Sequence, residues 1–185
     1  LLSGGAAAQE LQRGPPSVLL PGIGTQDPRR PVDRNALPWR ALGRVQTELG
    51  GRCTGAMVAP DRVLTAAHCL VAPRTGQFVQ PRSVHMLLGY HLGEWVAAAR
   101  VSAFTLAPGF APERMVAGTD WALLTLERPI AAPDRILPLL REPPPPRTPV
   151  MLGGYQQDRP EVVMADTACR LLGQFRDPSG RNVLA

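Results

Sequence analysis

A histidine, two cysteines and an aspartate have residue types and spacing that suit proton transfer. His68 ends the run 63–68 and precedes Cys69, while Cys53 lies sixteen positions upstream of Cys69. Asp120 opens a second apolar run further along the chain. A general base needs a fixed imidazole with a defined tautomer, and a buried aspartate that accepts the ring N–H supplies both. A disulfide beside the histidine would fix its turn, with up to about 3 kcal/mol of stabilisation for a loop of this size.

Each of these residues also has a less specific interpretation. His68 could be a packed or surface histidine, and Asp120 could be a turn residue at the start of a strand. Cys53 and Cys69 would be free thiols in a reducing compartment. A zinc site formed by His68 with both cysteines is disfavoured because no second ligand pair has metal-site spacing. We therefore expect no metal ion and no other cofactor.

The segments that would position these residues are short and are separated by turns. Gly50-Gly51 indicates a hairpin, and Pro60-Asp61 indicates a turn. The stretch 97–100, Ala-Ala-Ala-Arg, would also suit a helix. Short strands at regular spacing favour an all-β barrel architecture. The predicted strands are 43–49, 53–59, 63–65, 83–88, 96–103, 121–126, 150–155 and 162–172.

The composition supports a domain of ordinary size with many turns. The chain has 185 residues, of which 44% are hydrophobic and only 5% are aromatic, and it contains 21 prolines and 18 glycines. It has no apolar run of the roughly 18 residues that a membrane-spanning helix needs. The net charge is +5, and all 20 basic residues are arginines that are dispersed along the chain. Because nucleic-acid binders usually cluster their positive charge, we expect no nucleic-acid partner. Because a long apolar run is lacking, we also expect no membrane span.

The motif Thr65-Ala66-Ala67-His68-Cys69 resembles the chymotrypsin/trypsin-like serine proteases. Cys53-Thr54-Gly55 upstream and 120–124 downstream (Asp-Trp-Ala-Leu-Leu) follow the same pattern. The segments 38–44 and 165–169 are similar to the secreted bacterial branch that includes glutamyl endopeptidase-like enzymes. The resemblance runs from about Trp39 to the end of the chain.

This resemblance implies an all-β, trypsin-like double β-barrel with the active site between the barrels. The first barrel would be complete and the second partial. His68 matches the general base, Asp120 matches the residue that orients it, and Cys53 and Cys69 match the disulfide beside it. The implied partners are protein or peptide substrates.

The nucleophilic serine of that family has no counterpart here. Ser179 in Asp177-Pro178-Ser179-Gly180 resembles it only superficially, since the preceding proline lacks an N–H that could bind an oxyanion. We interpret it as a turn and expect the nucleophile to lie outside this sequence. Cys169 is an odd cysteine, which in an exported protein suggests a partner beyond the segment. No Ile-Val-Gly-Gly follows an arginine near the front, so activation by a new amino terminus of that type is not expected.

Composition shifts divide the chain into five predicted parts. Residues 1–8 end in small residues like the last part of a signal peptide, which indicates export. Four consecutive prolines mark the main internal boundary. The parts are 1–8, a signal-peptide remnant; 9–37, a propeptide or N-terminal arm; 38–142, the first barrel; 143–148, a linker; and 149–185, the start of the second barrel.

The sequence therefore predicts a secreted serine endopeptidase whose nucleophile lies outside these residues. The alternative is a catalytically inactive, protease-like module that binds proteins. His85 and His91 have no evident partner, and we expect Trp95 and Trp121 to be core or barrel-cap residues.

Overall fold

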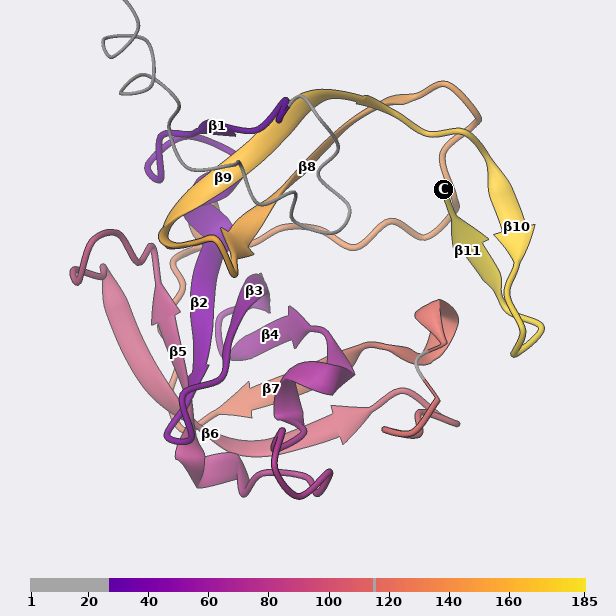
Figure 1. Ribbon diagram of the computed structural model, residues 1–185. Helices are drawn as coiled ribbons and strands as arrows, with labels where there is room; N and C mark the ends of the chain where they lie inside the picture. The colour runs from indigo at the N-terminus through magenta and orange to yellow at the C-terminus, as the bar shows by residue number, and fades with distance from the viewer. Residues whose placement is uncertain (1–26, 115) are drawn as a thin grey trace, which may run out of the picture.

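The computed structural model describes residues 27–114 and 116–185 (Figure 1). The predicted signal-peptide remnant, 1–8, and most of the predicted N-terminal arm lie outside the described residues. The described residues form strands, five short 3-10 helices and loops. No helix among them is long and apolar enough to cross a membrane.

Six antiparallel strands close into a barrel, as predicted for an all-β chain. Around the barrel the order is β2-β3-β4-β7-β6-β5. The 3-10 helices at its ends are η2 (Trp39–Ala41), η3 (Ala67–Leu70), η4 (Pro81–Ser83), η5 (Ala117–Thr119) and η6 (Pro133–Arg135). The strands are β2 (Leu42–Thr47), β3 (Arg52–Ala59), β4 (Arg62–Thr65), β5 (Val84–Leu88), β6 (Ala97–Leu106) and β7 (Ala122–Leu126).

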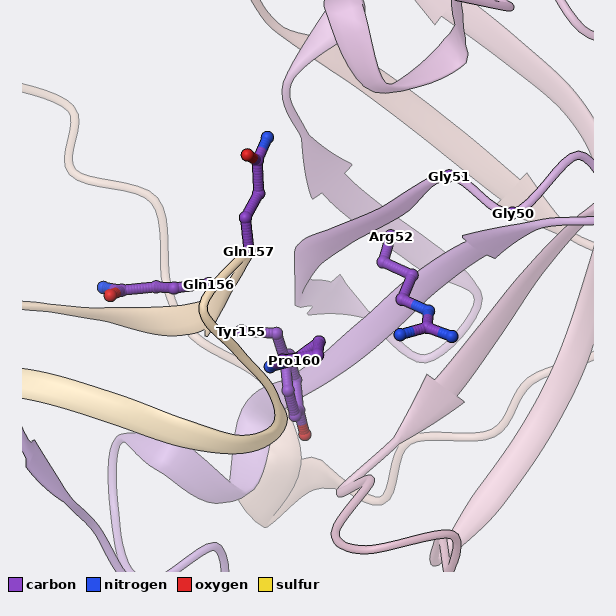
Figure 2. A pocket seen from close by; sticks show the side chains of 7 residues that line it. All are labelled: Gly50, Gly51, Arg52, Tyr155, Gln156, Gln157 and Pro160. Carbon is purple, nitrogen blue, oxygen red and sulfur yellow. The ribbon is translucent and has the colours of Figure 1, made fainter. Parts of the chain in front are cut away.

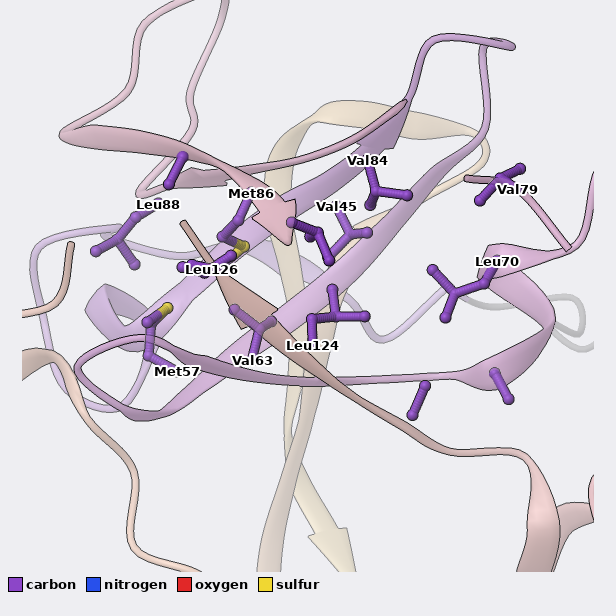
Figure 3. Packing of buried hydrophobic residues seen from close by; sticks show 14 of the residues in the cluster. Val45, Met57, Val63, Leu70, Val79, Val84, Met86, Leu88, Leu124 and Leu126 are labelled. Carbon is purple, nitrogen blue, oxygen red and sulfur yellow. The ribbon is translucent and has the colours of Figure 1, made fainter. Parts of the chain in front are cut away.

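Aliphatic side chains fill the barrel, because alternate residues of each strand point inward. The buried positions on β5 and β7 alternate with partly exposed ones. Gly55 on β3 lets two core valines meet, since a Cβ there would lie 2.6 Å from Val63 and 2.7 Å from Val45. The largest buried side chains are Val45, Met57, Val63, Leu70, Val84, Met86, Leu88, Val101 and Leu124 (Figure 3).

The remaining strands of the described residues form a smaller second unit. Strands β8 (Pro149–Gln156) and β9 (Arg159–Arg170) form a long hairpin, and β1 (Arg30–Pro31) adds to the outer side of β9. The remaining strands, β10 (Gln174–Arg176) and β11 (Asn182–Leu184), form a separate hairpin, which the sequence analysis did not predict. Figure 1 shows this second unit, in orange and yellow, above the barrel.

Most predicted strands of the barrel agree with the structure. The ambiguous segment 97–100 belongs to strand β6 and is not helical. Trp95 and Trp121 are not core residues, contrary to that part of the prediction, because their exposed fractions are 51% and 38%. Trp95 lies in the loop between β5 and β6, and Trp121 precedes β7, so neither is on an inward-facing strand position.

A polar cluster joins the barrel to the second unit. The Arg44 guanidinium lies 3.5 Å from the centre of the Tyr90 ring and donates to Glu161 on β9 at 3.0 Å. The Tyr90 hydroxyl also donates to Glu161. The Tyr155 hydroxyl donates to the Tyr90 carbonyl at 2.6 Å, and burial raises the pKa of Tyr155. Hydrogen bonds across this junction therefore hold the two units together.

These contacts predict an acid-sensitive junction. The Tyr90 hydroxyl and the nearby arginines lower the pKa of Glu161 below its ordinary value of 4.5. A carboxylate with a lowered pKa stabilises the fold above its unfolded pKa, and this contribution is lost as the pH falls. Glu161→Gln should therefore lower the free energy of unfolding at pH 7, and its deficit should shrink below pH 4.5.

Guanidinium denaturation at pH 7 and at about pH 3 measures this difference. Glu94→Gln is the matched control, since Glu94 pairs with Arg34 only at 3.4 Å on an exposed loop. A Glu161→Gln deficit that is equal at both pH values would contradict the prediction.

Candidate active site

His68 is held in place by the way strand β4 ends. Thr65, the last residue of β4, donates its hydroxyl to the Thr54 carbonyl at 2.8 Å. The chain then enters η3, where Ala67 and Leu70 are fully buried. In a 3-10 helix, residues three apart share a face, so these two anchor one side of the turn. His68 lies on the other side, with 47% of its side chain exposed.

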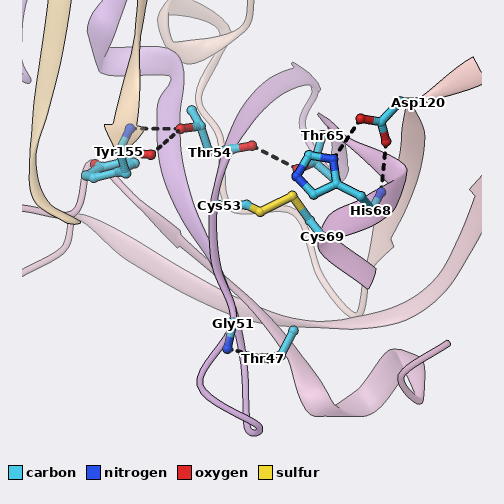
Figure 4. The surroundings of a disulfide bond; sticks show 9 residues. All are labelled: Thr47, Gly51, Cys53, Thr54, Thr65, His68, Cys69, Asp120 and Tyr155. Carbon is cyan, nitrogen blue, oxygen red and sulfur yellow. Dashed lines mark hydrogen bonds and ion pairs between the residues drawn. A yellow bond between two sulfur atoms is a disulfide. The ribbon is translucent and has the colours of Figure 1, made fainter. Parts of the chain in front are cut away.

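A disulfide ties the same turn to strand β3. Cys53 and Cys69 are bonded, with their Cα atoms 6.2 Å apart (Figure 4). Their sulfurs and the His68 ring are the one group of potential metal ligands found among the described residues. Because the two sulfurs are bonded to each other, they do not form the zinc site that the sequence analysis disfavoured.

Asp120 reaches the same end of the barrel through the partner strand of β4. Strand β7 pairs with β4 so that Ala122 lies opposite Thr65. Asp120 has φ −85° and ψ 61°, and the amide of Trp121 donates to the Thr119 carbonyl at 3.0 Å. These values define an inverse γ-turn, which is common where a strand begins. The turn directs the Asp120 carboxylate toward η3.

Asp120 binds His68 through both of its carboxylate oxygens. Oδ1 accepts the backbone N–H of His68 at 2.9 Å, and Oδ2 lies 2.7 Å from the ring Nδ1 (Figure 4). Because a carboxylate only accepts hydrogen bonds, Nδ1 carries the proton of the neutral ring and Nε2 has a free lone pair. Only 18% of the Asp120 side chain is exposed, so water competes little for this bond.

The arrangement leaves His68 suited to act as a general base. Within the described part of the chain, no hydrogen bond uses the Nε2 atom. A ring that is fixed at Nδ1 and free at Nε2 can take a proton from a hydroxyl placed beside it. The structure thus brings together four predicted site residues: His68, Asp120, Cys53 and Cys69.

The serines that the structure describes are used elsewhere. Ser83 and Ser102 donate their hydroxyls to backbone carbonyls, at 2.8 Å and 3.1 Å. Ser179 donates to the Asp177 carboxylate at 2.6 Å, within a turn. Ser3 and Ser17 lie outside the described residues.

Other candidate residues lie away from His68. Cys169 on β9 is a free, half-buried thiol. The Nε2 atom of His85 lies 3.5 Å from Glu48, on the outside of the barrel, and the amide of His91 bonds to Glu94 within a loop.

The sequence analysis missed Thr54, which connects the site to the second unit. Its carbonyl holds Thr65, and its hydroxyl oxygen accepts the amide of Tyr155 at 2.8 Å (Figure 4). A Cβ at Gly154 would overlap the Thr54 side chain, so β8 approaches β3 closely at this glycine. A glycine inside a strand pattern is a known sign of such an approach, and Gly153-Gly154 carried that signal.

The β2–β3 hairpin of the barrel and the β8–β9 hairpin of the second unit also border a pocket of about 290 Å³. Gly50, Gly51 and Arg52 line it from the barrel, and Tyr155 to Gln157 and Pro160 line it from the second unit (Figure 2). The two units therefore share one surface hollow.

The trypsin family model, described as "Trypsin", matches residues 28–168. The chain belongs to the trypsin family. This membership agrees with the resemblance that the histidine and aspartate motifs indicate.

Two further comparisons find similar proteins, one by sequence and one by fold. The chain is 36% identical over 62 residues to the glutamyl endopeptidase of Bacillus licheniformis. That match spans 34% of this chain and 19% of the relative, so it covers about a fifth of the relative's length. A solved structure entitled "Structure of Glu endopeptidase in complex with MPD" superposes with a TM-score of 0.65 and 18% identity, and it covers 76% of this chain and 67% of that one. This structural likeness confirms the predicted all-β, trypsin-like fold, with one closed barrel and a second unit that forms an open sheet.

The disulfide of this trypsin-family chain yields a stability prediction. A double Cys53→Ser/Cys69→Ser variant should lose about 3 kcal/mol of unfolding free energy, because the unfolded chain regains the freedom of a loop of about sixteen residues. Urea denaturation under oxidising conditions measures the loss.

Cys169→Ser is the control, because that thiol is free and its replacement should leave the unfolding midpoint nearly unchanged. Adding a thiol reductant to the wild type should reproduce the double variant. Equal stability of the double variant and Cys169→Ser would show that the cross-link does not stabilise the fold.

Proposed function

We propose that this chain carries the general base and the orienting carboxylate of a secreted serine endopeptidase. The observation that carries the proposal is that Asp120 accepts hydrogen bonds from both the amide and the ring of His68. A carboxylate held on Nδ1 stabilises the imidazolium that forms when Nε2 takes a proton. Membership of the trypsin family supports the same reaction.

The proposed reaction is acyl transfer to a serine supplied from outside these 185 residues. The serine oxygen attacks the peptide carbonyl while Nε2 of His68 takes its proton, and His68 then gives this proton to the departing amine. A water molecule then attacks the acyl-enzyme while Nε2 of His68 takes its proton, and His68 returns this proton to the serine oxygen as the acyl product leaves. Asp120 holds the ring in one orientation throughout.

We further propose that the protein works outside the cell. The Cys53–Cys69 disulfide supports this location, because disulfides persist in oxidising compartments and are rare in the cytosol. The predicted division into a first barrel at 38–142, a linker at 143–148 and a second unit from 149 is part of this proposal. The closed barrel spans strands within the first of these ranges.

One observation favours a second candidate, an inactive protease-like module that binds proteins. None of the serine hydroxyls in the described residues donates to His68. Labelling of the intact protein with a serine-reactive fluorophosphonate distinguishes the two candidates. Covalent labelling supports the peptidase, and its absence together with binding of an intact polypeptide supports the module.

Substitution of the base should abolish turnover. In the intact protein, His68→Ala should remove peptide hydrolysis, with a loss on the order of 10⁵–10⁶ in kcat. Release of peptides from casein measures the rate. His85→Ala is the matched control, since His85 lies on the outside of the barrel beside Glu48, and it should keep the wild-type rate. Near-normal turnover in His68→Ala would defeat the assignment.

Substitution of the orienting residue should have a smaller but still large effect. Asp120→Asn keeps the size of the side chain, but its amide can donate to Nδ1 and favour the wrong tautomer. We expect kcat to fall about 10⁴-fold while KM changes little. Measurement of kcat and KM on one short peptide checks this, and a loss confined to KM would contradict the role.

A further inference from the structure

We propose that Asp177 is a positioning residue, whose carboxylate holds the turn that presents Asp120 to His68. The inference rests on the proposed function, because it adds a residue to the same site. Asp177 lies at the tip of the β10–β11 hairpin, in the second unit, while η5 and Asp120 belong to the barrel. Strand β11 contacts η5, and Figure 1 shows the yellow hairpin beside that turn.

The hairpin tip fixes the direction of the carboxylate. Oδ1 of Asp177 accepts hydrogen bonds from the Ser179 amide at 2.9 Å, the Ser179 hydroxyl at 2.6 Å and the Arg181 amide at 3.1 Å. The amide of Asp177 also donates to the Arg181 carbonyl at 2.9 Å. Only 6% of Asp177 is exposed. One carboxylate oxygen is therefore fully used within the tip, and the other points outward from it.

That second oxygen binds the turn before Asp120. Oδ2 of Asp177 accepts the amide of Gly118 at 2.7 Å. The guanidinium of Arg181 donates to the Gly118 carbonyl at 3.3 Å and to the Pro108 carbonyl at 2.5 Å. The hairpin tip thus holds both backbone polar groups of Gly118, two residues before Asp120.

The contact is too close for any side chain at position 118. A Cβ on Gly118 would overlap Oδ2 of Asp177 and lie 3.0 Å from the Cβ of Arg181. Glycine is thus required here by the approach of the carboxylate and not by an unusual backbone angle. This requirement makes Gly118 a probe of the same contact.

The charge on Asp177 is stabilised by its surroundings. The Ser179 hydroxyl, with the amides of Arg181, Gly118 and Ser179, lowers the pKa of Asp177. The group is therefore ionised at neutral pH and accepts all four hydrogen bonds. An amide in its place could accept on one side only, because its NH₂ group would face another donor on the other side.

The clamp matters because the bond between Asp120 and His68 depends on small distances. Thr119, between Gly118 and Asp120, is buried and donates its hydroxyl to the Val116 carbonyl at 3.0 Å. A shift of the turn is therefore passed to Asp120. A displacement of about 1 Å can cost about 10²-fold in rate, even when it starts away from the reacting atoms.

The first experiment compares variants of the intact protein. Asp177→Ala should lower kcat about 10- to 100-fold with little change in KM, and Asp177→Asn should lower it less. Asp166→Ala is the matched control, since that carboxylate makes a similar bond to the amide of Ala168 within its own strand, at 2.9 Å. A kcat for Asp177→Ala equal to that of Asp166→Ala would overturn the proposal.

A double-variant cycle tests the contact itself. Gly118→Ala alone should lower kcat about as much as Asp177→Ala, because the added methyl group pushes the turn away from the carboxylate. In an Asp177→Ala background the overlap with the carboxylate is gone and only the 3.0 Å approach to the Arg181 Cβ remains, so Gly118→Ala should cost less than about 3-fold more. Losses that simply multiply would show that Asp177 does not act through Gly118.

A spectroscopic measurement separates this proposal from the proposed function. The Nδ1 proton of His68 should give a low-field ¹H NMR signal that is slow to exchange, and Asp120→Asn should remove it. Asp177→Ala should broaden or remove the signal while the chain stays folded by circular dichroism, and Asp166→Ala should retain it. If the wild type hydrolyses no peptide, the proposed function fails, yet this signal still tests the clamp. An unchanged signal in folded Asp177→Ala would overturn it.

Discussion

Two hydrogen bonds that the Asp120 carboxylate accepts set the geometry on which the site depends. Because Asp120 binds both the amide and the ring of His68, the ring is fixed in position and in tautomer. A single bond to Nδ1 would allow the turn to move with the ring, whereas the second bond ties the backbone as well. The pairing of β4 with β7 brings the two residues to one end of the barrel.

The barrel and the second unit contribute in different ways. The closed barrel, filled with aliphatic side chains, supplies a rigid support for η3 and for the turn before β7. Besides the cluster around Glu161, the second unit reaches back to the barrel near the site through Tyr155 to Thr54 and through Asp177 to Gly118. His68 and Asp120 are thus held from both sides, although both belong to the barrel.

Local patterns in the sequence predicted what depends on neighbouring residues. Strict alternation located β5, and the run after Asp120 located β7. The motif around His68 indicated its partner residues through the resemblance to a known family, since each residue by itself also allowed a less specific interpretation. Long-range contacts left a weaker mark: Gly153-Gly154 signalled the close approach of β8, but nothing in the sequence identified Thr54 as its target. Asp177 could not be identified, since a Pro-Ser-Gly turn looks the same whether or not its carboxylate reaches another element.

The short strand β1 has a consequence for how the protein behaves at high concentration. An open sheet exposes unpaired peptide groups along its outer strands, and these can recruit a second molecule. Here β1 covers the outer side of β9 over only two residues, and one of them is Pro31, opposite Met164. Proline has no amide hydrogen to offer to an incoming strand, so this margin of the sheet is a poor template for intermolecular pairing. At this position the segment therefore disfavours edge-to-edge pairing.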